Sequence, residues 1–328
     1  MNRHDEAAVL IESGDYPAAV HILCLVEKVS EIDAWNVVAA QLYLGQSVTV
    51  NQAEAVLIWE RLANSGNAHS QSVLGSVLVR RSDPESILKG VQWCEKAGNQ
   101  GNTHALCTLG QIYYEGVGPI AASPETCTSY FQKAADLGDT EAMLTLAHYY
   151  QIGFGVPQSG ERYMTLNKLA AEGGNPKGNY NLGVSYEFGR HSPVDDMEAF
   201  RHYEIAAQAG IPEAQHNLGA RYFNGKGVER NTAKGLYFYL HAASKGSHLS
   251  QHNLGLAYLA GDGVNRDEVS ALSWFLMGVD HGSNESQTYV EELQSRLSAE
   301  DVSRARELSR NFSDRWTAFT ANESDFKD

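Results

Sequence analysis

The chain has 328 residues, of which 43% are hydrophobic and 20% are charged, so it has the composition of a folded protein and not of a disordered one. Its formal net charge is -15, and it contains no run of five or more basic residues. Because an acidic surface repels phosphate backbones, we expect no binding of nucleic acid.

The N-terminal residues are acidic, and the longest apolar stretch, around residues 18–26, is interrupted by His21. Neither segment is typical of a secretory signal or of a membrane span. The chain has four cysteines and no C-x-x-C pair, the cysteines being Cys24, Cys94, Cys107 and Cys127. Free thiols in a reducing compartment are the simpler interpretation. We therefore expect a cytoplasmic protein without a membrane span.

Residues 4–29 predict a first pair of helices. The turn Ser13-Gly14-Asp15-Tyr16 separates the two, and Pro17 stands in the first turn of the second helix, where proline is favoured. This segment resembles the starting pair of a tetratricopeptide array, and we assign residues 1–32 to it.

From residue 33 onward the sequence repeats itself with a period near 36 residues. One glycine column contains Gly66, Gly101, Gly138, Gly174, Gly210, Gly246 and Gly282. A second column of small residues contains Ala39, Gly75, Gly110, Ala147, Gly183, Gly219 and Gly255. A third lies three residues before the first and contains Ala63, Gly98, Ala135, Ala171, Ala207, Ala243 and Val279. The spacing within all three columns departs from 36 residues by the same amounts in the same part of the chain, so the chain is predicted to have a repeat architecture.

Each unit resolves into two helices, as the sixth one illustrates. Ala214, Leu218 and Tyr222 are spaced four residues apart and form the apolar stripe of a first helix. Gly225 ends that helix, because glycine adopts the positive φ that a helix end requires. A second helix is expected over about residues 232–245.

The small columns have a packing reason. Gly219 falls within a helix, where glycine costs about 1 kcal/mol relative to alanine, and that cost is tolerable where a neighbouring helix approaches closely. One short helix pair cannot bury enough apolar surface to offset an ordering entropy of roughly 1–2 kcal/mol per residue. Stacked pairs bury both of their faces, which predicts an all-α solenoid.

The pattern A-x-x-x-L-G-x-x-Y-x-x-G-x-G resembles the Sel-1-like repeat, a relative of the tetratricopeptide repeat. It stands as AQHNLGARYFNGKG at 214–227 and, with serine in the alanine place, as SQHNLGLAYLAGDG at 250–263. Residues 104–118 and 142–155 also fit, and 179–192 fits without the second loop glycine. The resemblance implies an all-α, right-handed α/α solenoid superhelix of Sel-1-like or tetratricopeptide-like helix pairs.

We place seven units, the first two of which fit the pattern least well. Their bounds are 33–67, 68–102, 103–139, 140–175, 176–211, 212–247 and 248–283. Beyond them, Ser298 opens a final helix in the manner of a capping box, with Asp301 in place of the usual glutamate. We expect C-terminal capping helices over 284–317 and a flexible tail over 318–328.

Candidate catalytic and cofactor sites fail on spacing or context. Five residues separate Gly219 from Gly225, where a phosphate loop needs four, and the segment ends a helix instead of opening one. Gly153-Phe-Gly155 lacks the third glycine of a dinucleotide fingerprint. The pattern places no histidine or aspartate beside Cys107. Cysteine-rich relatives suggest a hydrolase, but this chain lacks their repeating cysteine pairs. We expect neither an enzyme nor a cofactor.

Three histidines have a spacing that metal ligands also use. His248 and His252 are four residues apart, and His216 matches His252 one repeat earlier. Solvated or hydrogen-bonded histidines are the simpler interpretation, because His248 lies at a helix start. We expect no metal site.

Two polar columns on the predicted first helices are not explained by packing. One contains Asn181, Asn217 and Asn253, and the one before it contains Tyr180, His216 and His252. The resemblance to tetratricopeptide solenoids implies that both columns face a concave groove. An asparagine there could donate to and accept from the backbone of a ligand. The alternative is a hydrogen bond from each asparagine to a neighbouring loop within the solenoid.

We therefore expect an adaptor or scaffold that binds a protein or peptide segment in the groove. The partner-binding residues would be Gln111, His148, Tyr180, Asn181, His216, Asn217, His252 and Asn253. The acidic balance favours a basic partner. The alternative is a dedicated inhibitor or immunity-type protein that wraps a single toxin or enzyme, a role that the resemblance also implies.

Overall fold

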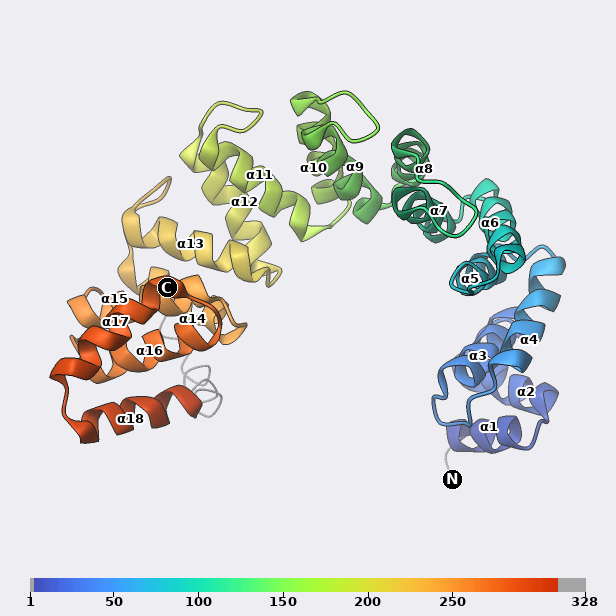
Figure 1. Ribbon diagram of the computed structural model, residues 1–328, viewed down its shortest axis with the longest axis horizontal. Coiled ribbons are helices and arrows are strands. Elements are labelled where there is room, and N and C mark those ends of the chain that lie inside the picture. The colour runs from blue at the N-terminus through green and yellow to red at the C-terminus, as the bar shows by residue number, and fades with distance from the viewer. Residues whose placement is uncertain (1–2, 312–328) are drawn as a thin grey trace. The chain divides into compact units, whose positions relative to one another are not determined.

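The computed structural model describes residues 3–311, which form eighteen α-helices and no strand (Figure 1). The first helices of the pairs are α1 (Arg3–Glu12), α3 (Glu31–Leu44), α5 (Ala68–Leu78), α7 (Thr103–Glu115), α9 (Thr140–Ile152), α11 (Pro176–Phe188), α13 (Pro212–Asn224), α15 (His248–Ala260) and α17 (Asn284–Arg296). The second helices are α2 (Tyr16–Glu27), α4 (Gln52–Asn64), α6 (Pro84–Asn99), α8 (Pro124–Asp136), α10 (Gly160–Glu172), α12 (Asp196–Gln208), α14 (Thr232–Ser244), α16 (Glu268–Asp280) and α18 (Ala299–Arg310). The predicted all-α solenoid of helix pairs is confirmed.

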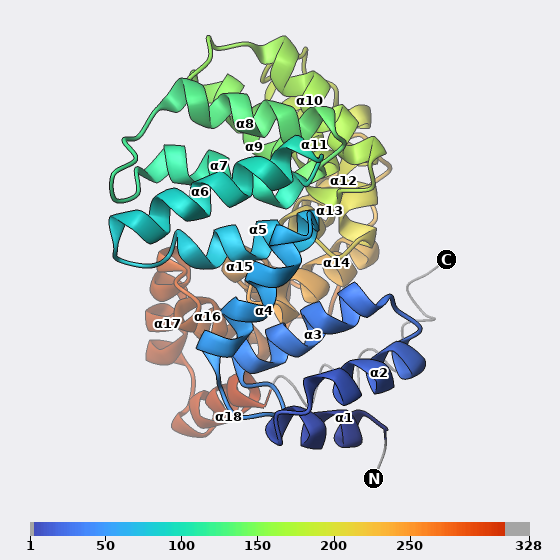
Figure 2. The same cartoon turned by 90° about the vertical axis from the view of Figure 1, so that its right-hand side faces the viewer.

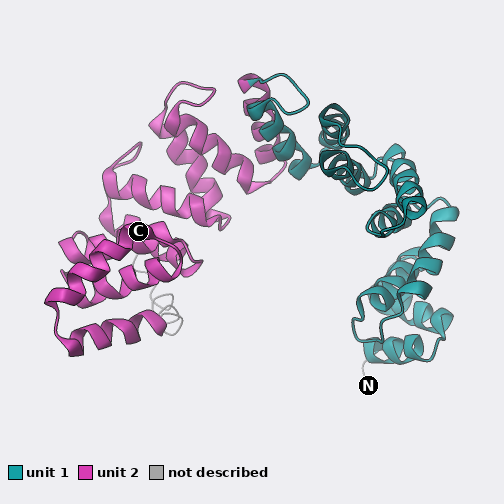
Figure 3. Cartoon of the chain, viewed as in Figure 1, with its two compact units in different colours: residues 1–159 teal, residues 160–328 magenta. Residues whose placement is uncertain are grey.

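The chain divides into two compact units, residues 1–159 and 160–328 (Figure 3). Within the first unit each helix packs against the next along the chain, and Figure 2 shows this stack rising from α1 to α8. The second unit is built in the same way from α10 to α16. The leucine column of the first helices is fully buried in each unit, at Leu74, Leu109, Leu146, Leu182, Leu218 and Leu254.

The helix ends follow the expected chemistry. The side chain of Asn231 accepts a hydrogen bond from the Lys234 N–H and so begins α14. Gly225 ends α13 with a φ of +69° and donates its N–H to the Arg221 carbonyl, which confirms the predicted helix stop. In the unit that lacks the second loop glycine, His191 takes the same left-handed conformation, with a φ of +64°.

The small column of the first helices marks close approaches between helices. A Cβ atom added at Gly219 would lie 2.8 Å from Tyr239 Cδ1, and one added at Gly255 would lie 2.6 Å from Phe275 Cε1. Because real Cβ atoms essentially never approach so closely, a side chain there would push the second helix away. The packing reason inferred from the sequence is thereby confirmed.

Both ends of the chain carry helix pairs. Asp15 accepts from the Ala18 N–H to begin α2, with Pro17 in its first turn. At the other end, Ser298 Oγ accepts from the Asp301 N–H at 3.1 Å, which is the N-cap half of the predicted capping box. The Asp301 carboxylate accepts from the Ser298 hydroxyl at 2.8 Å, where a capping box has a bond from the Ser298 N–H. The predicted flexible tail over 318–328 lies outside the described residues. In residues 3–311, no helix has the length and apolar character needed to cross a membrane.

Candidate functional site

The side of each unit on which successive first helices lie, which we call the first-helix face, carries an open hollow. In the first unit a hollow of about 460 Å³ separates α5 from α7, and in the second unit one of about 340 Å³ separates α13 from α15. The first is lined by Ser76, Val79, Arg80, His104, Thr108, Gln111, Ile112, Glu115 and Val117. The second is lined by Ala220, Phe223, Asn224, Tyr239, Asn253, Leu256, Ala257, Ala260 and Asp262.

These two hollows occupy the same place in the repeat. Ser76 and Gln111 of the first correspond to Ala220 and Leu256 of the second, when the chain is aligned by its glycine columns. The hollow between α5 and α7 has the charged side chains Arg80 and Glu115 in its lining, whereas most residues that line the one between α13 and α15 are apolar. Two of the predicted residues line them, Gln111 in the first unit and Asn253 in the second.

The asparagine column joins each first helix to the second helix of the preceding repeat. Asn181 Nδ2 donates to Asn167 Oδ1 at 2.8 Å. Asn253 hydrogen-bonds Tyr239. Burial raises the pKa of Tyr239, the hydrogen bond with Asn253 partly offsets this rise, and the resulting pKa is about 12. Asn217 hydrogen-bonds the corresponding tyrosine one repeat earlier, Tyr203. All three asparagines therefore form hydrogen bonds within the solenoid, to the preceding second helix where the sequence analysis named a neighbouring loop.

The histidine column makes contacts in the opposite direction along the chain. His216 Nδ1 lies 2.9 Å from Ser250 Oγ in the following repeat, and His252 Nδ1 lies 3.0 Å from Ser286 Oγ. Both serines are fully buried. Burial, and secondarily the nearby His248, lowers the pKa of His216 to about 4, so this imidazole is neutral at pH 7.

The remaining predicted residues differ in their surroundings. Tyr180 is half-buried, with its ring 6.1 Å from the ring of Tyr203. Gln111 and His148 are exposed in the first unit, and the Gln111 amide donates to the Glu115 carboxylate.

A buried arginine in the second unit escaped the sequence analysis. Arg221 is 1% exposed and pairs with Asp196 at 2.9 Å and with Glu187 at 3.2 Å. Its NH1 also donates to the Lys226 carbonyl at 3.4 Å, and its guanidinium lies 5.5 Å from the Tyr203 ring. These contacts hold the loop after α13 against the start of α12. Because charges at the centre of a repeat must be paired to be stable, we interpret Arg221 as structural.

The described residues contain no group of three or more histidine, cysteine, aspartate or glutamate side chains placed to hold a metal ion. The four cysteines are free. Burial raises the pKa of Cys94 and of Cys107 to about 12, which keeps these two thiols protonated and weakly nucleophilic at neutral pH.

Stacked helix pairs with recurring small columns define an α-solenoid repeat protein. The family model of the Sel1 repeat matches the chain seven times, at 38–67, 71–102, 103–139, 140–175, 176–211, 212–247 and 248–283. The chain therefore belongs to the Sel1 repeat family.

The chain is similar to several solved structures, one of which shows the same fold over most of its length. The chain is 27% identical to a Sel1 repeat protein from Oxalobacter formigenes, with a TM-score of 0.68 over 84% of this chain and 81% of that one. It is 21% identical to c5321, a protective antigen of uropathogenic Escherichia coli with an SLR fold, over 97% and 86% of the two chains, with a TM-score of 0.37. It is 18% identical to the immunity protein Pa5087 from Pseudomonas aeruginosa, over 65% and 81%, with a TM-score of 0.38. No curated protein matches the chain.

Proposed function

We propose that the chain is a non-catalytic interaction module that binds an extended protein segment on the first-helix face of its second unit. The observation that carries the proposal is the hollow between α13 and α15, which is open, mainly apolar and edged with amide groups. Repeat solenoids of this kind use such faces to hold partners. Sel1 repeat proteins generally mediate interactions between proteins, which supports the same assignment.

The hydrogen-bonded columns have a supporting part in this proposal. Asn217, Asn253, His216 and His252 hold neighbouring repeats in register, so their remaining polar atoms would meet a ligand from fixed positions. In the second unit, Tyr180 and Asn181 would extend the same surface toward α11. Gln111 and His148 would serve a corresponding surface in the first unit.

The apolar part of the hollow would supply most of the binding energy. Leu256 and Ala220 are partly exposed, and Ala260 is exposed. Asp262 at the rim already accepts two hydrogen bonds from Arg230, at 2.9 and 3.0 Å. An apolar partner side chain therefore fits between the helices. The formal charge of -15 favours basic residues on either side of it.

The test is affinity capture of partners from cells that produce the protein, with the wild-type chain and with Leu256→Glu. A carboxylate at Leu256 would have to be desolvated under a bound apolar side chain, so we expect at least a tenfold loss of captured partner. The matched control is Ile205→Glu, which places the same charge on an exposed position of α12 in the same unit.

Ile205→Glu should melt close to the wild-type temperature, because Ile205 is exposed. Leu256 packs partly against the core cluster of α16–α18, so Leu256→Glu should melt somewhat lower, and capture is compared at a temperature at which both variants are folded. If Leu256→Glu captures the same partners in the same amounts as Ile205→Glu, the first-helix face of the second unit is not the binding surface. Capture of one partner at equal stoichiometry would assign the chain to the dedicated-inhibitor class.

A further inference from the structure

The second unit has another hollow, on the side where its second helices lie. It separates α12 from α14 and has a volume of about 520 Å³. Its lining consists of Ala207, Gln208, Gln215, Tyr222, Lys234, Tyr237, Phe238 and His241. Pockets of roughly 300–1,000 Å³ with aromatic walls and a few polar groups are the usual sites of small ligands. The proposed first-helix binding surface does not include this hollow.

Gln215 is the polar group on which the inference depends, because it is 7% exposed and lines the hollow. Its Nε2 donates to the Ala207 carbonyl at 3.2 Å. Since a carbonyl can only accept, this bond fixes the amide with Oε1 turned the other way. Among residues 3–311, Gln215 Oε1 has no hydrogen-bond partner.

The same position in two other repeats shows what normally satisfies this oxygen. Gln71 and Gln251 also donate Nε2 to the carbonyl eight residues earlier, at 3.0 Å in both cases. Gln71 Oε1 accepts from Gln100 at 2.7 Å, and Gln251 Oε1 lies 3.0 Å from the ring nitrogen of His281. In those repeats the end of the next second helix supplies a donor.

Around Gln215 neither equivalent donor is available. The residue aligned with His281 is Lys245, and its Nζ donates to the Gly210 carbonyl at 2.6 Å instead. In the preceding repeat the residue aligned with Gln215 is Asn179, and its side-chain oxygen lies 2.9 Å from His202 Nδ1. The residue of the Gln215 repeat that aligns with His202 is Phe238, whose side chain has no donor. A buried acceptor thus faces a hollow with no hydrogen-bond partner from the described part of the chain, which is an unfavourable state unless a ligand supplies a donor.

The walls of the hollow are aromatic. The rings of Tyr222 and Phe238 stack at 5.8 Å with an interplanar angle of 3°, and Tyr237 packs edge-on against Phe238 at 5.2 Å. Aromatic rings bind other planar rings by offset stacking or by edge-to-face contact. The walls therefore favour a flat apolar group, and Gln215 adds the requirement for one donor.

We propose that this hollow binds a planar aromatic group carrying one N–H or O–H donor, with an indole or a phenol as the simplest examples. The ring would pack against Tyr222 and Phe238, and the donor would bond to Gln215 Oε1. Such a group can come from a free small molecule or from a tryptophan or tyrosine side chain of another protein.

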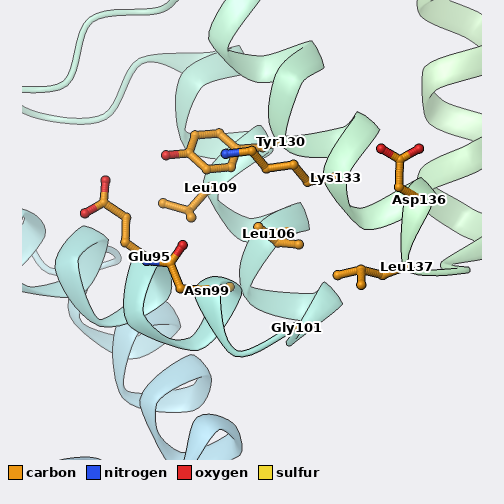
Figure 4. A pocket seen from close by; sticks show the side chains of 10 residues that line it. Glu95, Asn99, Gly101, Leu106, Leu109, Tyr130, Lys133, Asp136 and Leu137 are labelled. Carbon is orange, nitrogen blue, oxygen red and sulfur yellow. The ribbon is translucent and has the colours of Figure 1, made fainter.

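The first unit contains an internal comparison site. The corresponding hollow between α6 and α8 has a volume of about 620 Å³, and Leu106 stands in it where Gln215 stands in the second unit. Figure 4 shows Leu106 at its centre, with Tyr130 and Lys133 along one side, in the places of Phe238 and His241. This hollow has one aromatic wall residue, Tyr130, and has Leu106 in place of the buried amide acceptor, so it should not distinguish a ring with a donor from one without.

The experiment titrates the full chain with indole and with N-methylindole, which has the same ring and no N–H, and follows binding by saturation-transfer NMR. One hydrogen bond to a buried neutral acceptor corresponds to about a five- to tenfold preference for indole. In Gln215→Leu this preference should disappear. Leucine already occupies the aligned position in Leu106, so the substitution suits the repeat.

Gln251→Leu is the matched control, because the Gln251 amide is satisfied within the chain, and it should leave the preference for indole unchanged. A third probe, N-acetyltryptophanamide, separates the two sources of the ring. If it binds as well as indole, the site accepts a protein side chain, and if it is excluded, the site takes a free molecule. Equal binding of indole and N-methylindole to the wild-type chain would overturn the proposal, as would a preference that survives in Gln215→Leu.

Discussion

At the scale of single residues, polar side chains in this solenoid occur in matched pairs between repeats. His216 and His252 each lie beside a serine of the next repeat, and Asn36 accepts from Ser70 at 2.9 Å in the same arrangement. Where the first member is a cysteine, as at Cys107, the aligned partner is alanine. The chemistry of one repeat therefore depends on its neighbour.

The neutral state of His216 predicts a pH dependence of stability. Its folded pKa is about 4 and its unfolded pKa is about 6.5, so the unfolded chain binds the proton more tightly. The contribution of this residue is therefore complete above about pH 6.5 and is lost as the pH falls toward 4. The variant His216→Asn copies the Asn36–Ser70 pair and has no imidazole to titrate. Between pH 7 and pH 4 we expect its unfolding free energy to fall by about 2–3 kcal/mol less than that of the wild type.

Urea unfolding at a series of pH values measures this difference. Carboxylates titrate in the same range in both proteins, so the difference between the two curves isolates the imidazole. Parallel curves for wild type and His216→Asn would show that His216 is not buried as a neutral group.

The residue scale is also where the sequence predicts least. The asparagine column is visible in the sequence, but its partners Asn167, Tyr203 and Tyr239 belong to the preceding second helix, and only packing brings the two together. The constant spacing could have indicated these pairs, because each second-helix partner lies fourteen residues before its asparagine. Arg221 gives no such signal, since the aligned residues in neighbouring repeats are Ser185 and Ala257.

At the scale of elements the sequence predicts much more, because each helix end and each close contact recurs. In the last three repeats the small column of the first helices faces an aromatic side chain of the second helix. Gly183, Gly219 and Gly255 stand opposite Tyr203, Tyr239 and Phe275, in that order. A glycine on the first helix thus makes room for an aromatic ring on the second helix, and the ring sets the distance between the two helices.

Gly255→Ala tests this exchange. The new methyl group would lie 2.6 Å from Phe275 Cε1, and we expect a loss of about 1–3 kcal/mol in unfolding free energy despite the better helix propensity of alanine. Phe275→Leu removes the ring and should be costly alone, but the double variant should lose at least about 1 kcal/mol less than the sum of the two. Additive losses in urea unfolding would mean that the contact does not set the helix distance.

At the scale of the whole molecule, stability requires that the last repeat be covered. Leu272 and Phe275 of α16 are fully buried, and they pack with Val290 and Leu293 of α17 and with Ala305 of α18. The family model ends at residue 283, before both of these helices. We therefore interpret α17 and α18 as a cap that the last Sel1 repeat needs in order to bury its outer side.

Ending the chain at residue 283 should consequently destabilise the second unit. Leu272 and Phe275 would lose the part of their cover that α17 and α18 provide. Each fully buried side chain of this size contributes roughly 1.5–3 kcal/mol, so even partial exposure removes a noticeable share of the ~5–15 kcal/mol that stabilises a typical protein. We expect the melting temperature to fall by about 10 °C or more and the shortened chain to bind a hydrophobic dye. The full-length variant Leu293→Ala keeps both helices, and its melting temperature should lie between those of the wild type and the shortened chain. A shortened chain that melts with the wild type and binds no dye would mean that the seven repeats are stable without a C-terminal cap.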